Sequence, residues 1–189
     1  AQPIPGAPTL TVGTSTETTV TVNWNTVSGA SAYRLYSSTN SGVTTSDNQT
    51  VVAGNSYTVS GLTSGDTLYF AMIAESTVGQ SGLSSEVSAT AVPTQPGTLT
   101  ASPKWDGGAV SLSWTASVGH DGYKILYHEG SRDLNYLIAN GSEQSVDQNK
   151  TSKNISALTI NQLGSYVIKA YNSGGDSVYS NVVEEQAIP

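Results

Sequence analysis

The stretches TVTVNW at residues 19–24 and AVSLSW at residues 109–114 decide the fold of this chain. In both, apolar side chains alternate with polar ones and the stretch ends in Trp. A β-strand points successive side chains to opposite faces, so this period of two predicts a strand with one buried face. Such a face must pack against a second sheet, and we therefore expect an all-β chain built from sandwiches.

The two stretches belong to an internal repeat. Trp24 recurs as Trp114 and Tyr33 as Tyr123, both at an offset of 90 residues. Further along, the offset is 96 residues, so the second copy is longer by about six residues, which fall within residues 129–153. Buried aromatic and aliphatic residues are expected at the matching positions. The core residues that we predict are Trp24, Tyr33, Leu62 and Phe70 in the first copy, and Trp114, Tyr123, Leu158 and Tyr166 in the second.

The segment VPTQPG at residues 92–97 separates the two copies. It is too short for a floppy tether and too rich in Pro for a central strand, which predicts a semi-rigid connection. We place the boundary near Pro93, which gives one domain at residues 1–93 and another at residues 94–189. A chain of 189 residues has the right length for two domains of about a hundred residues each.

Composition argues against several classes of protein. The net charge of −7 repels nucleic acid and anionic membrane surfaces, so we expect no nucleic-acid partner. No apolar run is long enough to span a bilayer, and no membrane insertion is expected. The chain has no Cys and therefore no disulfide. Because it begins at Ala1 rather than at Met, we interpret it as an excised or processed fragment.

The repeated blocks resemble the fibronectin type III family. In the first copy the resemblance is carried by PTL at residues 8–10, the Trp24 and Tyr33 strands, LTSG at 62–65, FAMIA at 70–74 and SSEV at 84–87; the second copy repeats it from Pro96 to Val183. It covers nearly the whole chain and implies two consecutive seven-stranded, immunoglobulin-like β-sandwiches. The sequences of the strands are most similar to those of fibronectin type III copies in bacterial secreted or surface multidomain proteins, among them polysaccharide-degrading enzymes.

Both copies depart from the family at one corner. The family usually has a Tyr six residues after the Leu that precedes the sixth strand, but Leu68 and Gly164 stand there in this chain. The corner must therefore be held in another way, and we expect the adjacent Tyr69 to help in the first copy. The second copy, with NQLG at residues 161–164, departs most, and a local distortion is expected there.

No arrangement of residues points to catalysis. The chain lacks Cys and the G-x-S-x-G turn, and its two histidines, His120 and His128, are not placed in any catalytic pattern. Zinc ligands at motif spacing are missing as well, so we predict no catalytic residues, no metal and no cofactor. Calcium stays open as an alternative, because Asp106 and Asp176 lie in Gly-rich loops, although such Asp-Gly pairs are usually plain turns.

Aromatic residues of the second copy are the candidates for ligand binding. Trp105 lies outside the core pattern, in the turn between the first two strands, and Tyr127 and Tyr136 could extend an aromatic surface. A ring at a loop tip stacks on sugars or on proteins, whereas the alternative is that Trp105 packs on its own sandwich or on a following domain. The enlarged segment at residues 129–153 is where such a domain would acquire a specific function.

These observations favour a non-catalytic spacer or scaffold: a pair of extracellular modules within a larger secreted or cell-surface protein. The alternative is a carbohydrate- or protein-binding adhesion module that uses the exposed aromatics of the second copy. The expected partners are neighbouring domains of the parent protein, then a polysaccharide or a surface protein, and we expect a monomer. The chain is not expected to be an enzyme by itself, but could be an accessory fragment of a polysaccharide-degrading one.

Overall fold

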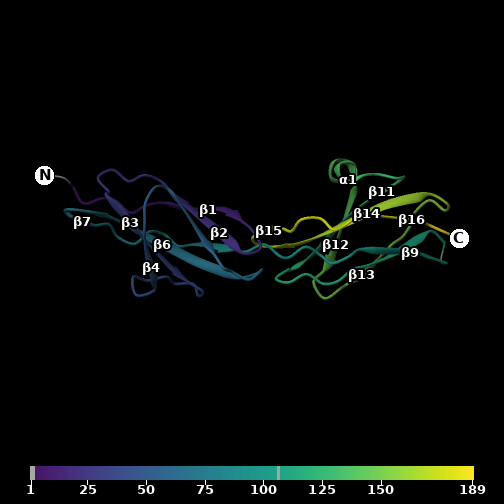
Figure 1. Cartoon of the computed structure of the whole chain (residues 1–189), viewed down its shortest axis with the longest axis horizontal. Coiled ribbons are helices and arrows are strands. Elements are labelled where there is room, and N and C mark those ends of the chain that lie inside the picture. Colours follow the sequence, from purple (N-terminus) through teal and green to yellow (C-terminus); the bar gives the residue numbers. More distant parts are fainter. Residues whose placement is uncertain (1–2, 106) are drawn as a thin grey trace. The chain divides into compact units, whose positions relative to one another are not determined.

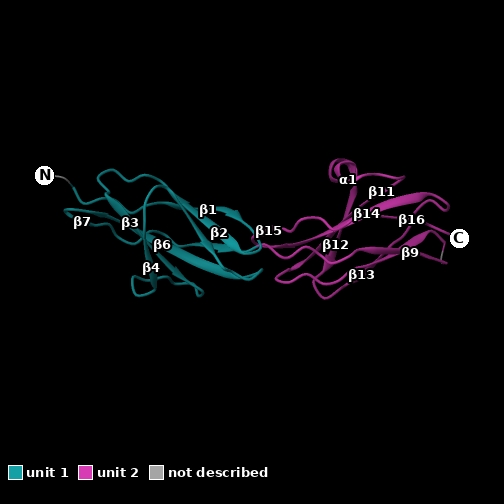
Figure 2. Ribbon diagram, viewed as in Figure 1, with its two compact units in different colours: residues 1–91 teal, residues 92–189 magenta. Residues whose placement is uncertain are grey.

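The computed structural model describes residues 3–105 and 107–189. It divides into two compact units, Ala1–Ala91 (unit 1) and Val92–Pro189 (unit 2), which Figure 2 shows in different colours. Both units are built from antiparallel strands, most of which are labelled in Figure 1.

Unit 1 is a sandwich of a three-stranded and a larger sheet. The first sheet has the order β1-β2-β5, with β1 Leu10–Ser15, β2 Thr19–Trp24 and β5 Ser56–Ser60. The second has the order β4-β3-β6-β7, with β4 Asn48–Val52, β3 Ala32–Ser38, β6 Thr67–Ser76 and β7 Gly79–Gln80; β8 Val87–Thr90 also pairs with β6. Because β7 and β8 both pair with β6, on either side of a short break, they act as one interrupted strand, which gives the predicted seven strand positions.

Two serines bridge the interruption between β7 and β8. The hydroxyls of Ser81 and Ser84 accept hydrogen bonds from the N–H groups of Ala74 and Met72, at 2.9 and 3.0 Å. The backbone amides of the serines donate to the carbonyls of the same two residues. The equivalent pairs in unit 2 are Ser177 with Ala170 and Ser180 with Ile168. The hydroxyls stand in for strand carbonyls, so the central strand keeps its amides satisfied.

Unit 2 repeats the sandwich with one addition. Its smaller sheet has the order β13-β10-β9, with β13 Ser152–Ile155, β10 Ala109–Ser113 and β9 Thr100–Lys104. Its larger sheet has the order β12-β11-β14-β15, with β12 Ser142–Asp147, β11 Gly122–Glu129, β14 Leu163–Asn172 and β15 Gly175–Asp176; β16 Val183–Gln186 also pairs with β14. The addition is a short helix, α1 Leu134–Asn140, between β11 and β12.

Each unit closes a core of its own. Trp24 packs on Tyr33 with ring centroids 5.8 Å apart, and Trp114 packs on Tyr123 at 5.3 Å. The fully or nearly buried members of the predicted set are Trp24, Tyr33, Phe70, Trp114, Tyr123 and Tyr166. Leu62 and Leu158 are only partly buried, because they precede the long strands β6 and β14 and lie at the margin of each core.

The corner before β6 and β14 keeps its backbone without the family's Tyr. In unit 1, the carboxylate of Asp66 accepts a hydrogen bond from the Thr63 N–H at 2.8 Å. In unit 2, the carboxylate of Glu129 accepts from both the N–H and the hydroxyl of Thr159, at 2.6 and 2.9 Å. The expected help from Tyr69 is wrong: strand alternation turns its ring away from the core, onto an outer cluster around Val43.

The strain at this corner of unit 2 takes the form of two left-handed residues. Ala157 and Asn161 have φ of 61° and 62°, where the matching residues of unit 1 are Gly61 and Gly65 with φ of 79° and 88°. A left-handed backbone costs a residue with a Cβ roughly 1–2 kcal/mol, whereas Gly adopts it freely. The second unit therefore follows the same path through the corner with less suitable residues.

Candidate binding surfaces of the second unit

Trp105 is the most exposed large apolar residue at the β9–β10 turn. The residue is 84% exposed, so its ring does not fold back over its own sandwich. Backbone hydrogen bonds hold this turn to two other segments of unit 2. The Gly108 N–H donates to the Ile188 carbonyl at 3.2 Å, and the Gly108 carbonyl accepts from the Leu158 N–H at 3.0 Å. Asp106, the calcium candidate in this loop, lies outside the described residues. The Trp105 ring is thus exposed on a turn whose backbone is held in place at Gly108.

Tyr127 lines a shallow cleft at one end of unit 2. Its ring stacks on Tyr166, with centroids 6.4 Å apart and planes 14° apart. The cleft has a volume of about 480 Å³ and is also lined by Glu129, Ser142 and Thr159. Glu129 is already engaged by Thr159, so the cleft offers a partly covered ring and hydroxyls rather than a free carboxylate.

Tyr136 belongs to a different surface, on α1. The helix begins at Leu134 because the side chain of Asp133 accepts the Tyr136 N–H at 2.8 Å. The ring of Tyr136 is held edge-on by His128 at 5.0 Å and under the guanidinium of Arg132 at 4.6 Å. The residue is 38% exposed, less than half as much as Trp105.

The structure does not bring Tyr127 and Tyr136 together. Tyr127 packs against the core of the sandwich. Tyr136 contacts His128, the next residue of β11, whose side chain points to the opposite face of the sheet. The three predicted ligand-binding residues therefore do not form one aromatic surface: Tyr127 and Tyr136 occupy opposite faces of the sheet, and Trp105 lies on a turn of the other sheet.

Asp176, the second calcium candidate, is committed to lysines. Its carboxylate lies 2.6 Å from the Lys169 ammonium and 3.2 Å from that of Lys124. Burial raises the pKa of Asp176, but the hydrogen bonds from the two lysines outweigh it and hold the pKa below the ordinary value. The lysines also lie over the rings of Tyr179 and Tyr171, at 4.8 and 5.1 Å. A carboxylate neutralised in this way is a poor cation ligand.

Neither a metal centre nor a membrane helix is found in the part that the structure describes. Within residues 3–105 and 107–189, no three His, Cys, Asp or Glu side chains are grouped so that they could hold a metal ion. Over the same ranges, no helix has the length and apolar character needed to cross a bilayer. Of the two histidines, His120 packs on Tyr123 at 4.5 Å and its ring is hydrogen-bonded to the Gln148 carbonyl.

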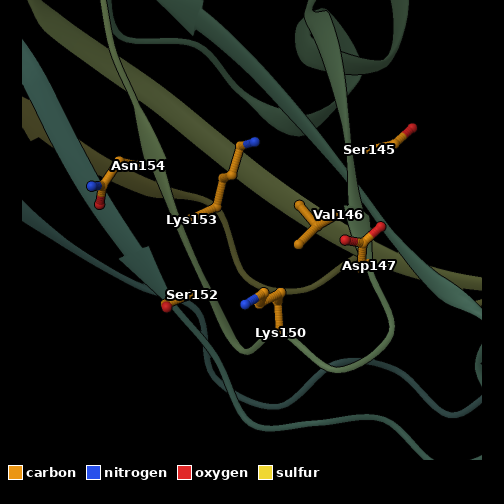
Figure 3. A pocket seen from close by; sticks show the side chains of 7 residues that line it. All are labelled: Ser145, Val146, Asp147, Lys150, Ser152, Lys153 and Asn154. Carbon is orange, nitrogen blue, oxygen red and sulfur yellow. The ribbon is translucent and has the colours of Figure 1, made fainter.

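A groove that the sequence reasoning missed lies between the edge strands β12 and β13 (Figure 3). Its volume is about 380 Å³, and Val146, Asp147, Lys150 and Lys153 are among the residues that line it. Lys153 occupies the position of Tyr57 in unit 1, whose ring packs against the core. A Lys at an inward position of a strand was the signal that could have revealed the groove.

Two curated proteins are similar to the chain over nearly its whole length. It is 33% identical over 182 residues to a Kelch domain-containing protein of Saccharolobus solfataricus and 27% identical over 181 residues to chitinase A1 of Niallia circulans. The alignments cover 93% and 89% of this chain but 23% and 24% of those proteins. The chain thus spans about a quarter of the length of these relatives. No family model matches it.

Solved structures show the same architecture. A crystal structure of the FN1–FN3 domains of chicken contactin matches all of this chain with a TM-score of 0.55 and 16% identity, and the match covers 69% of that chain. A segment of two fibronectin type III domains from chicken tenascin matches 96% of this chain with a TM-score of 0.53 and 19% identity, covering 98% of the tenascin segment. At these identities the likeness concerns the fold.

Proposed function

We propose that this chain, which folds as two consecutive fibronectin type III domains, is a non-catalytic spacer or scaffold within a larger extracellular protein. The observation that carries the proposal is that each unit buries a complete core of its own, on either side of the Ala91–Val92 junction. Two self-contained sandwiches in series hold flanking segments apart without needing a ligand. The partners of such a pair are the neighbouring domains of the parent protein.

The curated relatives support this proposal. One is named for a Kelch domain and the other for chitinase activity, and the region similar to this chain makes up about a quarter of each. A region that recurs in proteins with such different names supports a general role, such as that of a spacer, rather than the chitinase activity for which one of them is named. Secretion or display at the cell surface belongs to the same proposal, as does a monomeric state.

Distance measurement by single-molecule fluorescence tests the spacer function. Because the chain has no Cys, the exposed residues Ala7 and Gln162 can be replaced by Cys for specific labelling. A spacer predicts one narrow distribution of donor–acceptor distances that stays the same when soluble polysaccharides are added. A broad distribution, typical of a flexible tether, would contradict the proposal, and so would a shift on addition of a polysaccharide.

The exposed Trp105 ring favours one second function, the binding of a polysaccharide or a surface protein. The test is a pull-down on insoluble polysaccharides, followed by calorimetry, with Trp105→Ala beside the unchanged chain. A binder built on this ring should lose about 1–3 kcal/mol of binding free energy. The matched control is Val178→Ala, which removes another exposed apolar side chain of unit 2 (65% exposed) and should leave binding unchanged.

A further inference from the structure

The groove between β12 and β13 is bordered by two strand edges. β12 pairs with β11 on one side, and β13 pairs with β10 on one side; each is the terminal strand of its sheet in the described residues. Their outer edges carry backbone N–H and C=O groups without a strand partner. The groove is lined by three consecutive residues from each strand, so it runs along both edges.

Lys153 enters this groove from the inner face of its sheet. It lies opposite Leu112, a fully buried core residue, and shares its face with Ile155, which is fully buried as well. In unit 1 the same position is Tyr57, which lies opposite Val22 and packs against the core. A Lys covers less of the core than a Tyr does and keeps its ammonium near water. The exchange of Tyr for Lys therefore leaves a charged opening where unit 1 has a ring.

The charge of the groove contrasts with that of the whole chain. The chain has seven Lys and Arg and a net charge of −7. Within residues 3–105 and 107–189, Lys124 and Lys169 are paired with Asp176, while the ammonium groups of Lys150 and Lys153 have no ion pair. Both line the groove, as does Asp147, and Figure 3 shows the three side chains. Two lysines against one aspartate leave this groove positive.

We propose that the groove is a docking site for an extended acidic peptide segment, which pairs as an additional strand with the free edge of β12. Edge pairing provides the backbone hydrogen bonds, and alternate side chains provide specificity. An inward-facing Glu or Asp of the peptide lies beside Lys153 and Lys150, and an apolar neighbour on the same face covers Val146. β12 is the receiving edge because it has six residues, whereas β13 has four.

Two other occupants fit the groove less well. A second copy of this chain, paired through the same groove, would bring two further lysines, its own Lys150 and Lys153, to a groove that is already positive, and such like charges repel each other. A saccharide usually stacks on an aromatic ring, and none of the residues that line this groove is aromatic. The acidic peptide alone uses both the free edge and the unpaired lysines. This site is independent of the spacer function, which requires no ligand.

The test is a titration of the uniformly ¹⁵N-labelled chain, followed by NMR. The probe is the peptide acetyl-Thr-Glu-Thr-Val-Thr-Glu-Thr-amide, which places its Glu and Val side chains on one face of the strand, and the matched peptides carry Lys or Gln in place of Glu. We expect saturable shifts of the amides at residues 145–147 and 152–154 with the Glu peptide, weaker shifts with the Gln peptide and none with the Lys peptide. Added salt should weaken the binding, because the lysines are partly exposed.

Two variants and a control connect the binding to the groove. Lys153→Gln removes the charge, and Lys153→Tyr also fills the opening as in unit 1; each should weaken binding by roughly fivefold or more. Lys104→Gln makes the same charge change on β9, away from the groove, and should bind like the unchanged chain. An unchanged amide spectrum outside the groove shows that each variant is folded.

Three results would overturn the proposal. The first is no saturable shift with the Glu peptide, and the second is equal binding by the chain and by both Lys153 variants. The third comes from a parallel titration with a trimer of galacturonic acid: if it shifts the same amides in a Lys153-dependent way while the peptide does not, the site is one for acidic sugars.

Discussion

The two units differ most in how they cover the outer face of their larger sheet. In unit 1 a short loop places Val43 against Tyr36, Ala71 and Ile73. The loop is held by the Glu86 carboxylate, which accepts the N–H groups of Gly42 and Val43 at 2.8 and 2.7 Å. In unit 2 the corresponding cover is α1, whose Leu137 is fully buried against Leu126 and Val167.

This difference shows what the added residues of the second unit achieve. The insertion within residues 129–153 enlarges a cover that unit 1 already has, and its most buried side chain, Leu137, stabilises the sheet. The helix itself is therefore mainly structural. The features of this segment that unit 1 lacks lie after it, at the groove with Lys150 and Lys153.

The largest expected effect comes from removing the cover. Leu137→Ala should destabilise unit 2 by about 2–5 kcal/mol, because a fully buried Leu leaves a cavity. Val43→Ala should cost unit 1 less, because a smaller side chain is removed. Urea unfolding, followed unit by unit with NMR, measures both. Ile138→Ala on the same helix, at a residue that is 52% exposed, is the control and should change stability by less than about 0.5 kcal/mol.

An exchange of the aromatic residues at the matched core position sharpens the comparison further. The Tyr166 hydroxyl is buried without a hydrogen-bond partner among the described residues, and unit 1 has Phe70 there. Phe70→Tyr should therefore destabilise unit 1 by about 1–3 kcal/mol, whereas Tyr166→Phe should leave unit 2 equally stable or slightly more so. Urea unfolding of both variants measures these changes. A large loss of unfolding free energy in Tyr166→Phe would contradict the prediction, because it would mean that the hydroxyl has a hydrogen-bond partner.

The same residue predicts a difference at high pH. Burial, followed by the nearby carboxylates of Glu129 and Glu185, raises the pKa of Tyr166 to about 12 from an ordinary value of 10.0. A group whose pKa is higher when folded contributes its full stability below the unfolded pKa and loses it as the pH rises. Unit 2 should thus lose stability between pH 10 and 12, and Tyr166→Phe should show less of this loss in unfolding curves recorded across that range.

The left-handed corner gives effects of about 1 kcal/mol with opposite signs. Ala157→Gly should stabilise unit 2, because it relieves a positive φ, and Gly61→Ala should destabilise unit 1 by a similar amount. A Cβ at Gly61 would meet nothing within 4 Å, so its cost is one of backbone conformation alone. Chemical denaturation of the two variants measures both changes in unfolding free energy. Changes of the same sign would contradict the explanation that backbone strain at positive φ causes them.

The smallest effect is expected at Asp176. Its lowered pKa means that its contribution is present above the unfolded pKa, near 4, and is lost as the pH falls through the folded value. Asp176→Asn should therefore lower the stability of unit 2 slightly at neutral pH and flatten its decline in acid. Thermal unfolding between pH 2 and 7 measures both the loss of stability at neutral pH and the decline in acid. If stability declined as steeply in acid in the variant as in the unchanged chain, the Asp176 carboxylate would not contribute to stability in this way.

Much of the fold could be predicted from the sequence, because the strands are specified by the local alternation of apolar and polar side chains. TVTVNW and AVSLSW specify strands with a buried face, and the 90- and 96-residue offsets specify two equivalent sandwiches. The structures of tandem fibronectin type III domains confirm the predicted fold class. The helix α1 could not be predicted, because seven residues are too few to show a recurring helical pattern of apolar side chains. Its conformation depends instead on the tertiary burial of Leu137.

The candidate surfaces could be predicted only in part. Trp105 stood out because no core pattern claimed it. Residue type alone suggests that Tyr127 and Tyr136 share a surface, but which face of the sheet each ring occupies depends on strand register and on the docking of α1. The groove depends on the separation of two strands that belong to different sheets, and no local pattern encodes that distance; only the replacement of Tyr57 by Lys153 marks it.

The most direct test of the central claim, that the chain is two self-contained modules, is native-state hydrogen exchange on the whole chain and on Leu137→Ala. The account predicts that the amides of β11 and β14 lose protection in the variant, while those of β3 and β6 keep the protection they have in the unchanged chain. A parallel loss of protection in β3 and β6 would contradict it, because the two cores would then unfold as one.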